Sequence, residues 1–142
     1  MAILPELQAH ILASATGFQA GSAVGSTGVP IFLGQLPAEQ PDRAVALYES
    51  GGLPPMRTMG STGTGVDHEQ PSIQVLNRAP GYAQARADAR TIYGVLSAVK
   101  NSTLTSVLYV DVIPVQTPFD LPQDSRDRQV FSCNYTVQKE ES

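Results

Sequence analysis

The spacing of apolar residues predicts two helices. In residues 3–15 and 82–100, hydrophobic side chains recur three and four positions apart, as they do in helices that pack on a sheet. Pro80 and Gly81 mark the start of the longer helix, and Asn101 marks its end. The predicted buried stripe of this helix is Ala85, Ala89, Ile92, Leu96 and Val99.

Five further stretches are predicted to be strands. They cover residues 29–33, 43–48, 72–78, 104–113 and 128–138. The last stretch alternates most regularly between apolar and polar positions, which is typical of a strand with one buried face. The residues predicted to face the core there are Phe131, Cys133, Tyr135 and Val137.

The order of these elements predicts an α+β fold. It favours a mainly antiparallel sheet with two helices packed on one face, which is the simplest arrangement of helices and strands in this order. Long Gly/Pro-rich loops join the elements, chiefly at residues 49–70 and 114–127, and a glycine-rich connector covers residues 17–28. We expect a single domain over residues 1–142, with residues 139–142 forming a frayed tail.

Composition narrows the choice of partners. Charged residues make up only 15% of the chain, against an average of about 25%, so the surface is either hidden against other subunits or polar but neutral. The formal net charge is −4, and the nine Lys and Arg residues form no basic tract, which disfavours tight DNA or RNA binding. No apolar run has the length of a membrane span.

Few residues could carry catalysis. His68 lies between Asp67 and Glu69, but the place of a second zinc-binding histidine four residues later is taken by Ser72. Cys133 is on the apolar face of its strand, where a buried, inert thiol is expected. We therefore expect no catalytic residue, no metal site and no cofactor. A small ligand-binding domain with its site in the glycine-rich loops remains an alternative.

Several stretches resemble a bacteriophage family. They are residues 29–34 (VPIFLG), 41–52 (PDRAVALYESGG), 68–78 (HEQPSIQVLNR) and 128–135 (RQVFSCNY), together with the helix that holds Tyr82 and Ala85. In this order they are similar to the minor capsid or tail terminator proteins of long-tailed phages. The resemblance covers residues 1–138. Asn77 stands where the family often has an apolar residue, and the glycine-rich stretches are longer than usual.

The resemblance implies a structural virion protein and no enzyme. Proteins of this kind form a ring, usually of six copies, that caps the tail tube and joins it to the head-tail connector. The implied partners are further copies of the chain, the tail tube protein and the connector or head-completion protein, with DNA passing nearby without specific binding. Assembly would take place in the host cytoplasm. An alternative is a head-completion or neck adaptor on the connector side.

Two sets of residues are candidates for these contacts. The loops at residues 51–70 and 114–127 would dock on neighbouring proteins. Interface candidates are Arg43, Tyr48, Arg57, His68 and Arg78. Acidic residues that could face the central channel, or lumen, of a ring are Asp67, Glu69, Asp120 and Asp124. The alternative for Arg43 and Arg78 is that they are solvated charges at strand edges, which contribute little.

Overall fold

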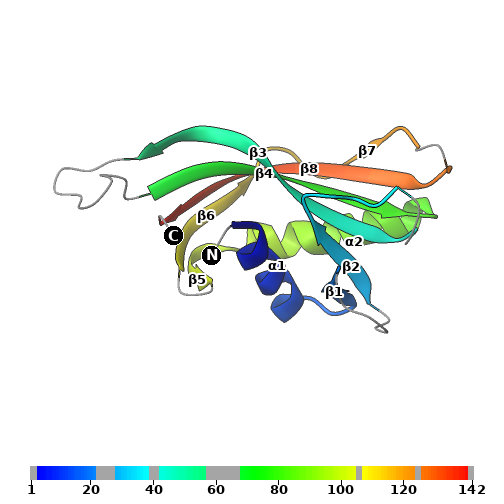
Figure 1. Ribbon diagram of the computed structural model, residues 1–142, viewed down its shortest axis with the longest axis horizontal. Helices are drawn as coiled ribbons and strands as arrows, with labels where there is room; N and C mark the ends of the chain where they lie inside the picture. The colour runs from blue at the N-terminus through cyan, green and yellow to red at the C-terminus, as the bar shows by residue number, and fades with distance from the viewer. Residues whose placement is uncertain are drawn as a thin grey trace.

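Both predicted helices are present and lie on the same face of a curved sheet (Figure 1). The structure is a computed structural model that describes residues 3–21, 28–38, 42–56, 68–104, 107–123 and 126–140. Helix α1 spans Ile3–Ser14 and helix α2 spans Tyr82–Ser97. Gly81 precedes α2 in an extended conformation. The helix ends at Ser97, before the predicted end at residue 100, and Lys100 and Asn101 already belong to a strand. Neither described helix is both long and apolar enough to span a membrane.

The sheet has eight strands, in the order β1-β2-β3-β4-β8-β6-β5, with β7 also pairing with β8. Strand β7 lies on the same side of β8 as β6, further along β8. The strands are β1 (Phe18–Ala20), β2 (Val29–Leu33), β3 (Ala44–Met56), β4 (His68–Ala79), β5 (Lys100–Leu104), β6 (Val107–Pro114), β7 (Phe119–Leu121) and β8 (Gln129–Glu140).

The α+β class is confirmed, but the expectation of a mainly antiparallel sheet is wrong. Strands β1 and β2 run parallel, and so do β2 and β3, so the sheet is mixed. The remaining described pairs are antiparallel. The reason is that apolar alternation specifies which face a residue takes and not the direction of its strand. Here the link between Leu33 and Ala44 returns the chain to the same end of the sheet.

The strands also reach further than the sequence indicates. β3 and β4 extend into the predicted loop at residues 49–70, with a register shift between Glu49 and Gly52. Gly51 and Gly52 have φ of 88° and 142°, and a Cβ at Gly52 would lie 2.3 Å from the carbonyl oxygen of Gln70, so glycine is required at that crossing. Lys139 and Glu140 belong to β8 and not to a frayed tail.

The core lies between the sheet and the two helices. The predicted inward face of β8 is buried, and the predicted stripe of α2 packs against it. Leu7 and Ile11 of α1 add to the same cluster, and both are fully buried. The opposite face of the sheet carries no helix (Figure 1). We call it the open face.

Candidate functional site

An apolar row lies along one border of the open face. Strand β6, the link after it and strand β7 run beside β8, where even-numbered residues point away from the helices. Ile113 pairs with Thr136, Phe119 with Ser132 and Leu121 with Val130. The nitrogen of Val115 donates to the carbonyl oxygen of Asn134 at 2.8 Å, which continues this register. The row therefore consists of Ile113, Val115, Phe119 and Leu121.

These side chains are unusually exposed for apolar groups on a sheet. Ile113 is 47% exposed, Val115 63% and Phe119 40%. Single exposed apolar residues are common, whereas a contiguous group of them marks a contact site for another molecule. The apolar row is therefore the best candidate for a docking surface on the described part of the chain.

The sheet edge beside the apolar row is unsuited to adding a strand. From Pro114 to Leu121 no described strand pairs with its outer side, because β5 pairs only with residues 107–111 of β6. Pro114, Pro118 and Pro122 occur along it, and proline has no N–H to donate to a new strand. A partner at this border would consequently be held by side-chain packing.

Arg43 is engaged within the subunit. Its Nε and Nη2 atoms donate to the two carboxylate oxygens of Asp88 on α2, at 2.9 and 2.8 Å. The hydrogen bond to Asp88 raises the pKa of Arg43, and partial burial opposes this shift. Asp88 is nearly buried while Arg43 remains 42% exposed at its side chain. The pair ties the start of β3 to the middle of α2.

Two further arginines hold the link between β2 and β3. Arg78, which is 3% exposed, donates to the carbonyl oxygens of Pro37 and Asp42. Arg128, 4% exposed, donates to the carbonyl oxygen of Ala38 and to the Asp42 carboxylate, the latter at 3.3 Å. Charge-assisted hydrogen bonds of this kind fix a loop more firmly than neutral ones. Arg78 thus anchors a link inside the subunit.

The other interface candidates fall on the open face or outside the described residues. Tyr48 is half-buried on β3, opposite Gln74 of β4. His68 begins β4 and pairs with Glu140, which also points to the open face. Tyr48 and His68 therefore share the open face with the apolar row, whereas Arg57 lies outside the described residues.

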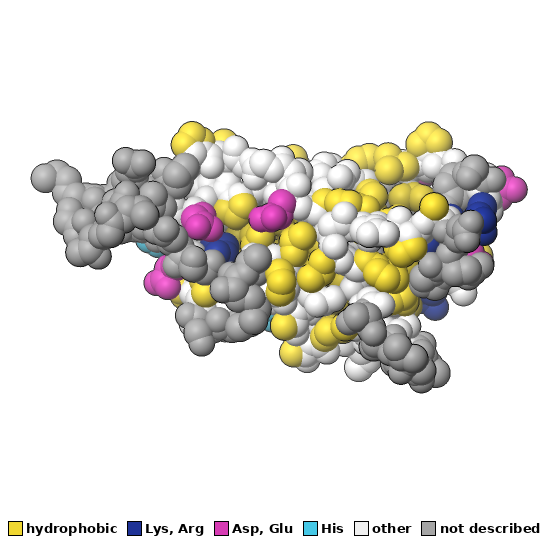
Figure 2. Space-filling view, viewed as in Figure 1, with side chains coloured by type: hydrophobic (Ala, Val, Ile, Leu, Met, Phe, Trp, Pro, Cys, Tyr) yellow, Lys and Arg dark blue, Asp and Glu magenta, His cyan; other side chains and the backbone are white. Residues whose placement is uncertain are grey.

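The two described acidic candidates for the lumen, Glu69 and Asp120, lie far apart on the sheet. Glu69 pairs with Lys139 at one end of β8, and Asp120 pairs with Phe131 near the other end. These positions are eight residues apart on β8, or roughly 27 Å. Asp67 and Asp124 lie outside the described residues. Figure 2 shows acidic side chains near the end where β3 and β4 project, and most basic side chains in view at the opposite end.

A buried charged group joins α1 to the sheet. Glu6 is fully buried, and one of its oxygens accepts a hydrogen bond from the Tyr109 hydroxyl at 2.7 Å. The Lys139 ammonium lies 3.8 Å from the same oxygen and 3.4 Å from Glu69. Burial, and then the hydrogen bond to Glu6, raise the pKa of Tyr109. Sequence reasoning missed this group, although Lys139 continues the inward alternation of β8.

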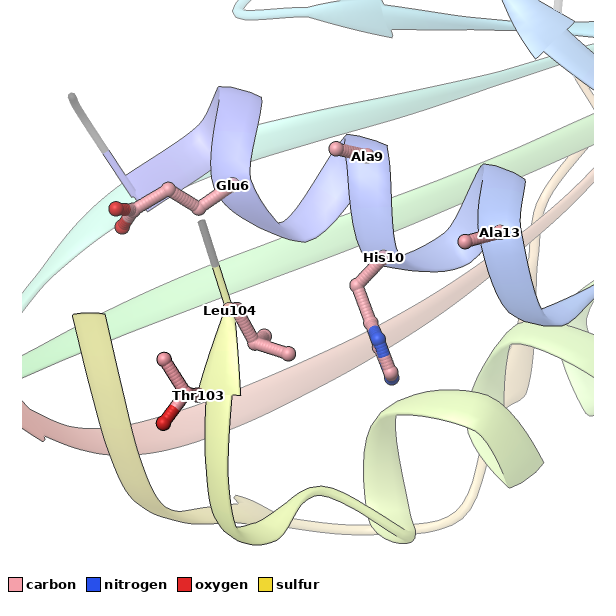
Figure 3. A pocket seen from close by; sticks show the side chains of 6 residues that line it. All are labelled: Glu6, Ala9, His10, Ala13, Thr103 and Leu104. Atoms are coloured by element: carbon pink, nitrogen blue, oxygen red, sulfur yellow. The ribbon is translucent and has the colours of Figure 1, made fainter. Parts of the chain in front are cut away.

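A shallow pocket of about 240 Å³ lies beside this group, between α1 and β5 (Figure 3). His10 points into it, and burial lowers the pKa of that imidazole. Among the described residues, no group of three or more His, Cys, Asp or Glu side chains is placed to hold a metal ion. Cys133 is buried, donates to the carbonyl oxygen of Gln116, and has its pKa raised by burial. The pocket is lined by Glu6, Ala9, His10, Ala13, Thr103 and Leu104.

Comparison with known proteins decides the family. The profile of the bacteriophage tail terminator protein family matches residues 11–141. The chain belongs to this family. The resemblance noted in the sequence is thereby confirmed.

This tail terminator also has a structural relative. A chain from the virion of a native gene transfer agent particle matches it with a TM-score of 0.60 and 18% identity, covering 99% of this chain and 96% of the other. That likeness supports the fold. No curated protein matches the terminator. Its family makes it a structural tail protein located in the virion.

Proposed function

We propose that this terminator forms a closed homo-hexameric ring at the head-tail junction, where it caps the tail tube and joins it to the connector. The observation that carries the proposal is the apolar row Ile113, Val115, Phe119 and Leu121 on a sheet face without a helix. Burying these side chains against another protein would remove apolar surface from water at roughly 25 cal/mol per Å². The low share of charged residues fits a chain with much of its surface in contacts.

A ring requires one patch of each subunit to meet a different patch of the next one, at an angle that closes. The open face and the helix layer are two such distinct surfaces. Tyr48 and His68 are the described interface candidates that lie on the open face, and Arg57 is a further candidate from the sequence. Arg43 and Arg78 would act indirectly, by fixing the link between β2 and β3.

The tail tube protein and the connector or head-completion protein are the proposed partners on either side of the ring. DNA would pass through the lumen without specific binding, because acidic groups repel phosphates. Asp120 is the described candidate best suited to the lumen, since it is exposed on β7. Glu69 is partly neutralised by Lys139, and Asp67 and Asp124 remain candidates from the sequence.

Electron microscopy of particles from a phage that lacks this gene tests the proposal. Tail tubes that overgrow their normal length and remain separate from filled heads would support a terminator ring. Normal tails beside heads that leak DNA would instead establish the head-side adaptor. Intact, infectious particles would refute both structural roles.

The pocket between α1 and β5 allows a check of the ligand-binding alternative. A ligand that binds only the folded protein raises its melting temperature. If the protein is structural and binds no small ligand, a thermal-shift screen with small metabolites should leave the melting temperature of the wild-type protein unchanged. A reproducible shift that disappears in an Ala9→Leu variant, which narrows the pocket, would favour the ligand-binding function.

A further inference from the structure

Exposed charge is divided between the two layers of the molecule. On α2 the exposed charged residues are Arg86 and Arg90, since Asp88 is buried against Arg43. The acid of α1, Glu6, is buried as well. Among the described strands, Lys100 at the start of β5 is the exposed base, because Arg78 and Lys139 are buried. Acids that are exposed on the strands are Glu49, Asp120 and Glu140. Asp111 and Glu69 are half-exposed, and Glu69 lies 3.4 Å from Lys139.

Two of these acids lie on the open face, at the end of the sheet beyond the apolar row. Asp111 pairs with Gln138 on β8, and Glu140 pairs with His68 on β4. Both β8 positions are even-numbered and point away from the helices. Lys100 of β5 is the cross-strand partner of Asp111 and lies beside it on this face, so the unbalanced negative charge there is that of Glu140. The open face thus combines exposed apolar side chains with one unbalanced acid.

The outward surface of α2 has the opposite charge. Arg90 lies with its guanidinium carbon 5.7 Å from the centre of the Tyr93 ring, and Arg86 is exposed one turn earlier. Ala87 is exposed between them. Its side chain is small, so a side chain of a neighbouring molecule can approach the helix backbone there. Arginine stems can also cover apolar groups while their guanidinium groups stay paired.

We propose that, in the ring, the outward surface of α2 of one copy packs on the open face of the next copy. This inference rests on the proposed ring. Arg86 and Arg90 would face Asp111 and Glu140, and the apolar row would be covered by the neighbouring helix. Every sheet in the ring would then have helices on both faces, an arrangement that buries apolar side chains on each side. The contact is head-to-tail, as a ring requires.

The main competing arrangement joins subunits edge to edge into one continuous sheet. Pro114, Pro118 and Pro122 oppose it at the β6–β7 border, because they remove N–H donors from that edge. Pairing of Arg86 and Arg90 with Glu140, and with Asp111 beside Lys100, would give the layered contact a preferred orientation.

Disulfide trapping in assembled particles distinguishes the two arrangements. We would introduce Ala87→Cys on α2 and Thr136→Cys on the open face, alone and together. Cys133 is buried with a raised pKa, so its background reaction should be slow. The double variant should give a ladder of linked subunits on a non-reducing gel, and each single variant should give none. An edge-to-edge control pair is Gln19→Cys with Gln123→Cys.

If the control pair gives a ladder and Ala87→Cys/Thr136→Cys gives none, the layered contact is wrong. The proposal of a ring would still stand. Absence of any ladder from particles that still carry capped tails would also overturn the layered contact. The gene deletion tests the ring itself, because it shows whether tails stay uncapped without the protein. Failure of the layered contact can therefore be distinguished from failure of the proposed ring.

Charge reversal provides an independent test of the same contact. Arg86→Glu/Arg90→Glu and Asp111→Lys/Glu140→Lys should each weaken ring formation at least about tenfold, because like charges would then face each other. Combining all four changes should restore much of the loss. Failure of the combined variant to recover, with native circular dichroism, would contradict the pairing.

Discussion

The two faces of β8 differ in burial, and in the proposed function one serves folding and the other assembly. Toward the helices the strand presents Phe131, Cys133, Tyr135, Val137 and Lys139, all buried. Toward the open face it presents Asn134, Thr136 and Gln138, half-buried and bordered by the apolar row. The odd-numbered residues 131–139 thus stabilise the subunit, while Asn134, Thr136 and Gln138 offer a surface. Substitutions on the two sides should therefore have separable effects.

The largest expected effect comes from the buried charged group. Lys139→Ala would leave Glu6 without its nearby ammonium, and removing one partner of a buried ion pair costs about 3–5 kcal/mol. Urea unfolding monitored by circular dichroism would measure the loss. Glu140→Ala is the matched control, one residue along and exposed, and should change stability by less than about 0.5 kcal/mol. Equal losses in both variants would contradict a special role for Lys139.

A matched pair of isoleucines compares the faces directly. Ile73 on β4 is fully buried toward the helices, so Ile73→Ala should cost about 2–5 kcal/mol. Ile113 is 47% exposed, so Ile113→Ala should cost far less stability and should impair ring assembly instead. Thermal unfolding and counts of capped tails would separate the two effects. Normal assembly by the Ile113 variant would count against the apolar row.

An arginine pair tests the link between β2 and β3. Arg78→Met removes charge-assisted hydrogen bonds to the carbonyl oxygens of Pro37 and Asp42, which should cost about 1.5–3 kcal/mol. Arg86→Met, on exposed α2, should leave unfolding nearly unchanged. Denaturant midpoints would be compared. A similar midpoint for both variants would show that the link needs no anchor.

The smallest effect concerns pH. Burial lowers the pKa of His10 in the folded state, so the unfolded state binds its proton more readily. The contribution of neutral His10 is therefore complete above the unfolded pKa of about 6.5 and is lost as pH falls below it. His10→Gln should flatten the dependence of melting temperature on pH below that value. An unchanged slope would show that His10 does not contribute.

The parts of the fold that sequence could predict are those with one buried face. The alternation over residues 131–137 and the apolar spacing from Ala85 to Val99 predict which side chains are buried, and these side chains are buried. The last of them, Val99, follows the end of α2 and is not part of the helix. Strand direction at β1, β2 and β3 could not be read, because parallel and antiparallel strands share the same alternation. The short strands β1, β5 and β7 have too few residues to show a period.

The candidate site was harder to anticipate for a different reason. The sequence does not show that Arg43 and Arg78 have partners within the subunit, because Asp88 and the Pro37 carbonyl are far away along the chain. Their contacts with other subunits stay a prediction. The sequence also does not show how far apart Glu69 and Asp120 lie, because that distance follows from the register of β4 and β7 along β8. The apolar row could not be recognised either, since its exposure depends on the position of β7 beside β8.

The prolines beside the apolar row also affect whether free copies of the protein aggregate before assembly. In the proposed function, each copy would have to stay unassembled until a tail end is ready to receive it. An edge that accepted strands freely would allow copies to stack into fibres meanwhile. We expect Pro114→Thr/Pro118→Thr to bind thioflavin T on storage while the wild type does not. The prolines would then prevent free copies from aggregating edge to edge, so that each copy stays available until a tail end is ready.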